Sequence, residues 1–253
     1  MNPIRAVAFD LFNTLITVEP QTLEDANARL FASLCGSDFE LEADSFLKAH
    51  RASAIRHIQI SREDGKETHN SLWISAALEE QGYRVPPEDS RIALAVDAYF
   101  SAFLDHCRLI PHTKEMLTTL RLSYPLGLLS NFTHGPAARK LLLNLGLDSF
   151  FEVVIISGEL GYRKPHPLPF MELVERLGVP NHQIIYVGDD PEPDIFGAKQ
   201  AGLQPVWTTY VRDSQIPFTA GILSSDQKHV EPEVPTISNW NDLFSLLEKN
   251  PES

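Results

Sequence analysis

Acidic residues follow two apolar runs in this chain, at positions where they could bind a cation. Asp10 ends the run Ala-Val-Ala-Phe, and Asp189, Asp190 and Asp194 come after Ile-Ile-Tyr-Val-Gly. Carboxylates gathered in one place repel each other unless a cation neutralises them. Carboxylate oxygens together with several waters suit Mg²⁺. The acids therefore predict a magnesium site.

Three further residues add groups that suit an anionic substrate. Ser130 and Asn131 end the apolar run Leu-Gly-Leu-Leu, and Lys164 lies in the loop Arg-Lys-Pro. A lysine supplies a point charge for an anion and can keep a nearby carboxylate ionised. A serine hydroxyl and the backbone N–H groups after it can donate hydrogen bonds to phosphoryl oxygens. Asp10 could then act as a covalent nucleophile, as carboxylates do in aspartyl-phosphate chemistry.

The elements that must bring these residues together alternate between strand and helix. Short apolar runs predict strands over residues 5–10, 126–130, 153–156, 184–187 and 205–208. Helical patterns that end at a glycine lie between them, over residues 136–145, 167–177 and 195–201. This alternation predicts a doubly wound, Rossmann-like α/β core with a parallel sheet covered on both faces. Ligands bind such a sheet at the carboxyl ends of its strands, where the polar residues lie.

Two parts of the chain depart from this alternation. Residues 19–105 are rich in Ala, Leu, Glu and Arg and have helical spacing over 39–47, 72–78 and 92–103. We expect about four helices there, separated by breaks at residues 35–37, 63–65 and 82–87. Near the other end, residues 210–235 have no clear period, and Asn239 or Asn241 opens a last helix that reaches Lys249. The expected domains are a core of residues 1–16 and 107–253 and an all-helical insert of residues 17–106.

Composition limits the classes of partner. The chain has 253 residues with 21 Lys and Arg against 34 Asp and Glu, a formal charge of -13. Such a surface repels nucleic acid and anionic lipid, so we expect a small-molecule substrate and no nucleic-acid or membrane partner. No apolar run approaches the roughly 20 residues that span a bilayer. Without a signal-peptide pattern, and with Cys35 and Cys107 interpreted as free thiols, the expected location is cytoplasmic and the expected state a monomer or homodimer.

Four motifs in this order resemble the haloacid dehalogenase-like hydrolase superfamily, subfamily I. They are Asp10-Leu-Phe-Asn-Thr-Leu15, Leu128-Leu-Ser-Asn131, Gly161-Tyr-Arg-Lys-Pro-His-Pro167 and Val187-Gly-Asp-Asp-Pro-Glu-Pro-Asp194. The resemblance covers residues 5–208, and the helical insert resembles the superfamily's C1-type cap domain. It implies a hydrolase, with phosphatase activity on a small phosphorylated metabolite favoured.

The resemblance also implies roles for single residues. Asp10 would be the nucleophile, and Thr14 would help to hold its loop. Ser130 and Asn131 would bind the group being transferred. Lys164 would contact the substrate and neutralise charge on it and on Asp10.

The implied cofactor is Mg²⁺. Asp10 and Asp189 would be ligands, with Asp194 or Asp190 assisting directly or through water. The backbone carbonyl of Phe12 would be a further ligand, and its side chain would lie beside the substrate.

Phe12 is also where the chain departs from phosphatases of the superfamily. The resemblance implies the pattern Asp-x-Asp in the first motif of those enzymes, with the second Asp, at the position of Phe12, as general acid/base. General acid/base catalysis contributes about 10²–10⁴-fold. Turnover should therefore suffer least with good leaving groups such as acyl phosphates, aryl phosphates and anhydrides. The histidines of the insert, His50, His57 and His69, are potential substitutes, and the sequence favours none of them.

Two alternatives follow from Phe12. The first alternative is a dehalogenase, because superfamily members that displace halide from 2-haloacids have a pattern like Asp-x-Tyr in this motif. The aromatic residue Phe12 fits that pattern loosely. Those enzymes need no Mg²⁺ and carry small polar residues where this chain has Asp189, which argues for the phosphatase. The second alternative is a non-catalytic protein that retains the fold.

Overall fold

The computed structural model describes residues 3–218 and 230–248, and its centre is a parallel sheet. Six strands lie in the order β5-β4-β1-β6-β7-β8, and every neighbouring pair is parallel. Their bounds are β1 Ala6–Phe9, β4 Leu126–Ser130, β5 Val153–Ile156, β6 Ile184–Gly188, β7 Gln204–Thr208 and β8 Thr236–Ile237. The chain runs outward from β1 on one side, then crosses back to β6, which is the doubly wound arrangement. The predicted fold class is confirmed.

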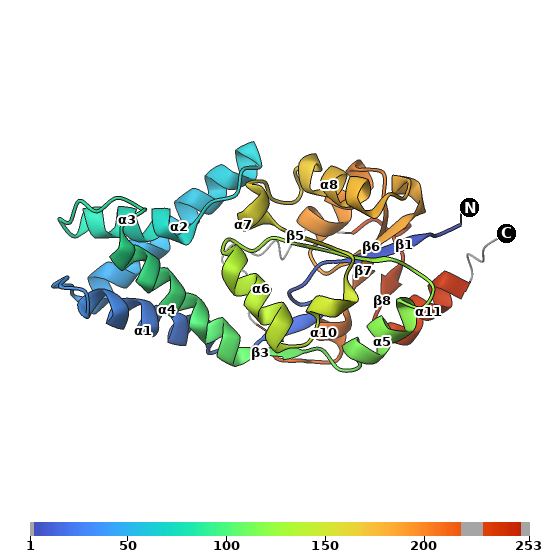
Figure 1. The fold of residues 1–253 in the computed structure, drawn as a ribbon, viewed down its shortest axis with the longest axis horizontal. Coiled ribbons are helices and arrows are strands. Elements are labelled where there is room, and N and C mark those ends of the chain that lie inside the picture. Colours follow the sequence, from blue (N-terminus) through green and yellow to red (C-terminus); the bar gives the residue numbers. More distant parts are fainter. Residues whose placement is uncertain (1–2, 219–229, 249–253) are drawn as a thin grey trace.

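Helices cover both faces of the sheet because alternate strand residues point to opposite faces. Val7 and Phe9 of β1 belong to one buried cluster, and Ala6 and Ala8 belong to another. Three helices pack in the first cluster, α5 Thr113–Leu120, α6 Gly135–Asn144 and α11 Trp240–Glu248. Two pack in the second, α8 Pro167–Leu177 and α9 Gly197–Gln200 (Figure 1). Shorter turns are η1 Asp148–Phe150, α7 Ser157–Leu160, η2 Asn181–Gln183, η3 Pro191–Phe196 and α10 Tyr210–Asp213.

The helical insert lies to one side of the sheet (Figure 1, left). It consists of four helices, α1 Thr22–Cys35, α2 Ala43–Asp64, α3 Asn70–Glu80 and α4 Ser90–His106. Two short antiparallel strands, β2 Ile16–Val18 and β3 Cys107–Leu109, pair where the chain enters and leaves it. The four helices and the three breaks between them agree with the prediction. The division into a cap domain of residues 17–106 and a core stays a prediction.

Two predicted helices have different starting points in the structure. Phe39 and Leu41 precede α2, because Glu42 accepts hydrogen bonds from the backbone N–H groups of Asp44 and Ser45 and so caps the helix there. The helix expected over residues 195–201 begins earlier, with the π-helical turn η3 at Pro191. The strand β8 was not predicted, and residues 219–229 of the turn-rich stretch lie outside the described part.

A second connection joins the insert to the core beyond the β2–β3 pair. Lys66 forms an antiparallel bridge with Tyr162, and Glu67 N donates to Gly161 O over 2.9 Å. Gly65 ends α2 with φ of 73°, a left-handed conformation that favours glycine, and a Cβ there would meet His166 at 2.5 Å. The loop after α2 is therefore docked on the loop that contains Lys164.

Cys35 and Cys107 are free thiols, and burial raises the pKa of Cys107 to about 12. Within residues 3–218 and 230–248, no helix is both long and apolar enough to cross a membrane.

His50 is a buried titratable group in the insert. It is 5% exposed and packs near the rings of Phe46, Trp73 and Tyr99, with centroids 6.1, 6.4 and 6.2 Å away. Its Nε2 has no hydrogen-bond partner among the described residues. Burial lowers the pKa of His50 to about 4 from 6.5, so the folded protein holds a neutral imidazole.

This burial predicts a pH-dependent loss of stability. Between pH 6.5 and pH 4 the unfolded chain binds a proton at His50 that the folded chain does not, so stability falls as the pH falls. Wild-type protein should lose about 2 kcal/mol more than His50→Leu between pH 7 and pH 5, measured by urea unfolding. The two proteins should show the same profile between pH 7 and pH 9. An equal loss in both on acidification would contradict the prediction.

Candidate active site

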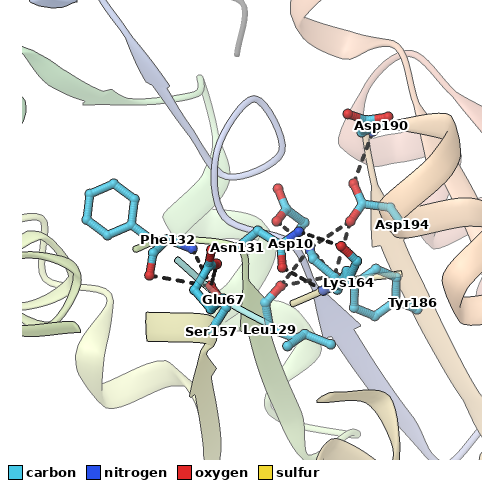
Figure 2. A network of polar contacts seen from close by, with 10 residues as sticks. All are labelled: Asp10, Glu67, Leu129, Asn131, Phe132, Ser157, Lys164, Tyr186, Asp190 and Asp194. Carbon is cyan, nitrogen blue, oxygen red and sulfur yellow. Dashed lines mark hydrogen bonds and ion pairs between the residues drawn. The ribbon is translucent and has the colours of Figure 1, made fainter. Parts of the chain in front are cut away.

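The ammonium group of Lys164 lies at the centre of a buried polar cluster at the carboxyl ends of β1, β4 and β6. Its Nζ is 2.7 Å from Asp10 Oδ1 and 2.7 Å from Asp194 Oδ1. It also lies 2.9 Å from the backbone oxygen of Leu129 and 2.8 Å from the hydroxyl of Tyr186 (Figure 2). The sheet brings these residues together because β1 pairs with both β4 and β6.

Asn131 fixes the loop that carries Lys164. Its Nδ2 donates to the backbone oxygen of Lys164 over 2.9 Å, and its Oδ1 accepts from the backbone N–H of Lys164 over 2.8 Å. Both ends of the Asn131 amide are therefore engaged in positioning the lysine. The substrate-binding role expected for Asn131 stays a prediction beside this contact.

The carboxylates determine the charge state of this cluster. Burial on its own would lower the pKa of Lys164, but Asp10 and Asp194 outweigh it and hold that pKa well above its usual value. Burial raises the pKa of Asp194 to about 6 against the opposing effect of Lys164. Burial, followed by repulsion from Asp194 and Asp10, holds the pKa of Asp189 well above its usual range. One ammonium group does not neutralise three acids.

The same three acids form a set that fits a metal ion. Asp10, Asp189 and Asp194 each offer an oxygen, and these oxygens lie within 4.8 Å of one another. An all-oxygen set of mutually repelling carboxylates suits Mg²⁺. Asp190 is not part of this set. Its Oδ1 accepts a hydrogen bond from the backbone N–H of Glu192 and so caps η3. The backbone N–H of Asp190 donates to Asp194 Oδ2 over 3.0 Å. The ligand role of the Phe12 carbonyl stays a prediction.

Two predicted site residues have buried hydroxyls that no described group satisfies. Ser130 at the end of β4 and Thr14 after β1 are each 1% exposed, and neither oxygen has a hydrogen-bond partner among the described residues. Buried hydroxyls are nearly always paired in folded proteins. Unsatisfied donors beside the ends of β1 and β4 fit a site that binds an anion.

A cavity of about 320 Å³ separates the sheet edge from the insert. Of the predicted site residues, Asp10, Phe12, Asn131, Lys164, Asp189 and Asp194 line it, as does Asp190, whereas Thr14 and Ser130 do not. The histidines of the insert do not line it either, so none of them stands in for an acid at position 12. The ring of Phe12 instead stacks on that of Phe132, with centroids 5.0 Å apart and an angle of 19°.

Two contacting groups were not found from the sequence. Tyr186 donates to the backbone oxygen of Leu129 over 3.0 Å and also contacts Lys164. A hydroxyl-bearing residue within an otherwise apolar strand is the sequence feature that could have indicated a polar contact there. Glu67 of the insert accepts from Ser157 Oγ over 2.5 Å (Figure 2). It also pairs with Arg163 over 3.1 Å. No local pattern around Glu67 marks it.

Known proteins resemble this chain over most of its length. The family model of haloacid dehalogenase-like hydrolases matches residues 4–202. Ribulose-1,5-bisphosphate 5-phosphatase of Halopiger xanaduensis is 31% identical over 95% of this chain and 99% of its own. Phosphoglycolate phosphatase of Escherichia coli is 38% identical over 82% of each chain.

Solved structures resemble the fold. A 2-haloacid dehalogenase from Pseudomonas syringae has a TM-score of 0.67 at 23% identity, covering 97% of this chain and 99% of its own. A magnesium-bound HAD hydrolase from Bacillus subtilis has a TM-score of 0.61 at 23% identity and the same coverage.

Removing Lys164 should destabilise the fold more than removing any one of its neutral partners. Lys164→Met leaves buried carboxylates without their cation, a loss of about 3–5 kcal/mol. Tyr186→Phe removes only a hydroxyl, a loss of about 1 kcal/mol. Urea unfolding in the presence of a chelator measures both. A Lys164→Met protein as stable as Tyr186→Phe would contradict the central role of this ion cluster.

Proposed function

The chain belongs to the haloacid dehalogenase-like hydrolase family, and we propose that it is a Mg²⁺-dependent phosphatase acting on a small phosphorylated metabolite through Asp10. The observation that carries the proposal is the pair of 2.7 Å contacts from Lys164 to Asp10 and Asp194 beside an open cavity. The named relatives are phosphatases of phosphorylated sugars and of phosphoglycolate, which supports the same chemistry.

The metal would be held by Asp10, Asp189 and Asp194. A divalent cation bound there supplies charge that offsets the three carboxylates and polarises a phosphoryl oxygen. The Lys164 ammonium adds a second positive charge on the same side of the cavity. Together the two cations match the charge of the three carboxylates, so an incoming phosphate would meet a cluster whose negative charge is offset.

Asp10 is the nucleophile in this proposal. Lys164 Nζ donates a hydrogen bond to Oδ1, which leaves Oδ2 for attack. As Oδ2 bonds to phosphorus, the bond from phosphorus to the substrate oxygen breaks, and that oxygen leaves with the electron pair. Water then attacks the phosphorus, the bond to Oδ2 breaks, and the carboxylate and inorganic phosphate are released. The hydroxyls of Ser130 and Thr14 have no hydrogen-bond partner among the described residues, but neither residue lines the cavity, so they are not assigned a contact with the phosphoryl oxygens.

Phe12 determines which substrates this mechanism serves. A phenyl ring donates no proton, so the leaving oxygen departs as an anion or takes its proton from solvent. Losing a general acid costs about 10²–10⁴-fold with a poor leaving group and little with a good one. The proposed enzyme is accordingly slow or selective for its leaving group.

Halide displacement is the second candidate because an aromatic residue occupies position 12 and a halide leaves without a proton. The cluster of Asp10, Asp189 and Asp194 argues against it, because halide displacement from a 2-haloacid needs no metal, and without one the substrate carboxylate would meet three acids. Likeness to solved dehalogenases at 23% identity shows the fold alone.

The proposal predicts Mg²⁺-dependent phosphate release from acetyl phosphate and p-nitrophenyl phosphate. Chelator should abolish it, and Asp10→Asn should reduce it to background because the variant lacks the carboxylate that attacks phosphorus in this mechanism. Release that survives in Asp10→Asn would refute the mechanism. Halide release from 2-chloropropionate that is unaffected by chelator would support the second candidate.

Restoring a carboxyl group at position 12 should broaden the substrate range. Phe12→Asp should raise turnover of an alkyl phosphomonoester by about 10²-fold or more while changing acetyl phosphate turnover little. The double variant Asp10→Asn/Phe12→Asp is the control and should be inactive. If Phe12→Asp leaves alkyl phosphate turnover unchanged in a folded protein, the missing acid is not what limits this site.

A further inference from the structure

The wall of the cavity opposite Asp10 is formed by apolar and aromatic side chains. The insert contributes Leu23 from α1, Ile58 from α2, Trp73 from α3 and Tyr99, Phe100 and Phe103 from α4. A phosphate held at Asp10 and Lys164 would direct its leaving group toward this wall. The side chains there consequently select what the phosphate is attached to.

An unbroken path of ring contacts runs from the nucleophile loop to the insert. Phe12 stacks on Phe132 at 5.0 Å, and Phe132 contacts Phe100 at 5.1 Å and Phe103 at 5.9 Å with steep angles of 63° and 73°. Rings in offset or edge-to-face contact stabilise one another beyond the area they bury. A further ring in the cavity would extend this path.

Several polar groups of the wall already have partners. Asn70 Oδ1 accepts from Thr133 over 2.5 Å, and Trp73 Nε1 donates to Thr68 Oγ1 over 2.9 Å. Arg163 is paired with Glu67. Burying hydroxyl groups of a sugar against such a wall would cost their hydrogen bonds to water. Arg62 at the end of α2 adds one positive charge to the lining.

The missing acid at position 12 is an independent observation that favours the same class of substrate. A phenol has a pKa of about 10, as in tyrosine, whereas an alcohol has a pKa roughly that of water, about 15.7. A phenolate can therefore leave without a proton donor far more readily than an alkoxide. Both the wall and the nucleophile loop suit an aromatic leaving group.

We infer that the preferred substrate is an aryl phosphate, a phosphate monoester of a phenol, with its ring against Trp73, Phe100 and Phe103. The inference rests on the proposed function and specifies its substrate class. It differs from the substrates in the names of the two relatives, ribulose 1,5-bisphosphate and phosphoglycolate, whose leaving groups are polar alkyl alcohols.

Binding of two phosphonates that are not hydrolysed tests the inference without requiring turnover. Phenylphosphonate and methylphosphonate share the anionic group and differ in the ring. Calorimetric titration of the full chain with Mg²⁺ should give a Kd at least about tenfold lower for phenylphosphonate. Phe103→Ala and the milder Phe103→Leu should each reduce that ratio. Phe31→Ala is the matched control, because Phe31 is a half-buried phenylalanine of α1 that does not line the cavity, and it should preserve the ratio.

Turnover gives a second readout. Phenyl phosphate should exceed phosphoglycolate in kcat/KM by about 10²-fold in wild type, and Phe103→Leu should raise the KM for phenyl phosphate while leaving that for acetyl phosphate unchanged. Preference for phosphoglycolate, or equal Kd values for the two phosphonates, overturns the aryl inference and leaves the proposed phosphatase intact. A ratio retained in both folded Phe103 variants overturns the role of this wall. If neither phosphonate nor inorganic phosphate binds, the proposed function fails as well.

Discussion

The repulsion among three neighbouring carboxylates, two of them buried, is the constraint on which this structure depends. Asp10, Asp189 and Asp194 bring their oxygens within 4.8 Å, and the one ammonium group that reaches two of them belongs to a distant loop. In a buried site each such charge contact is much stronger than in water. The two hydrogen bonds from the Asn131 amide to the Lys164 backbone and the contact of the Tyr186 hydroxyl hold this ammonium group in place. The charge that remains uncompensated supports the proposed metal site at this edge of the sheet.

Phe12 determines the character of the cavity on the side of the insert. Where an acid would face the leaving group, two stacked phenyl rings of Phe12 and Phe132 continue into the aromatic face of α4. Apolar walls exclude water and lower the local dielectric, which strengthens the contacts of Lys164 on the opposite side. The same substitution thus removes a proton donor and makes the cavity more apolar. Selection of the leaving group then depends on its own acidity and on its fit to rings.

The sequence predicts the sheet edge well because strand ends are local signals. Asp10 and Asp189 each follow an apolar run, Lys164 precedes a proline and Asp194 comes shortly after Asp189, and parallel strands bring such ends together. Tyr186 was missed because it lies inside its strand, and the early start of η3 was missed because the Asp190 cap precedes any apolar period. Glu67 lies 90 residues from Ser157, and no local pattern specifies a contact at that separation. For the same reason, the sequence could not predict which side chains of the insert's helices face the cavity.

The contacts of Glu67 connect the two halves of the site physically. The insert is attached to the core through the β2–β3 pair and through the docked loop of residues 65–68. Glu67 binds Ser157 and Arg163, and Arg163 immediately precedes the lysine that holds the nucleophile. Any rotation of the insert about the β2–β3 pair has to separate these partners and disturb the Lys164 loop. In the proposed mechanism, the insert and the ammonium that contacts Asp10 are thus connected through Glu67 and Arg163, so the fit of a leaving group would bear on the position of Asp10.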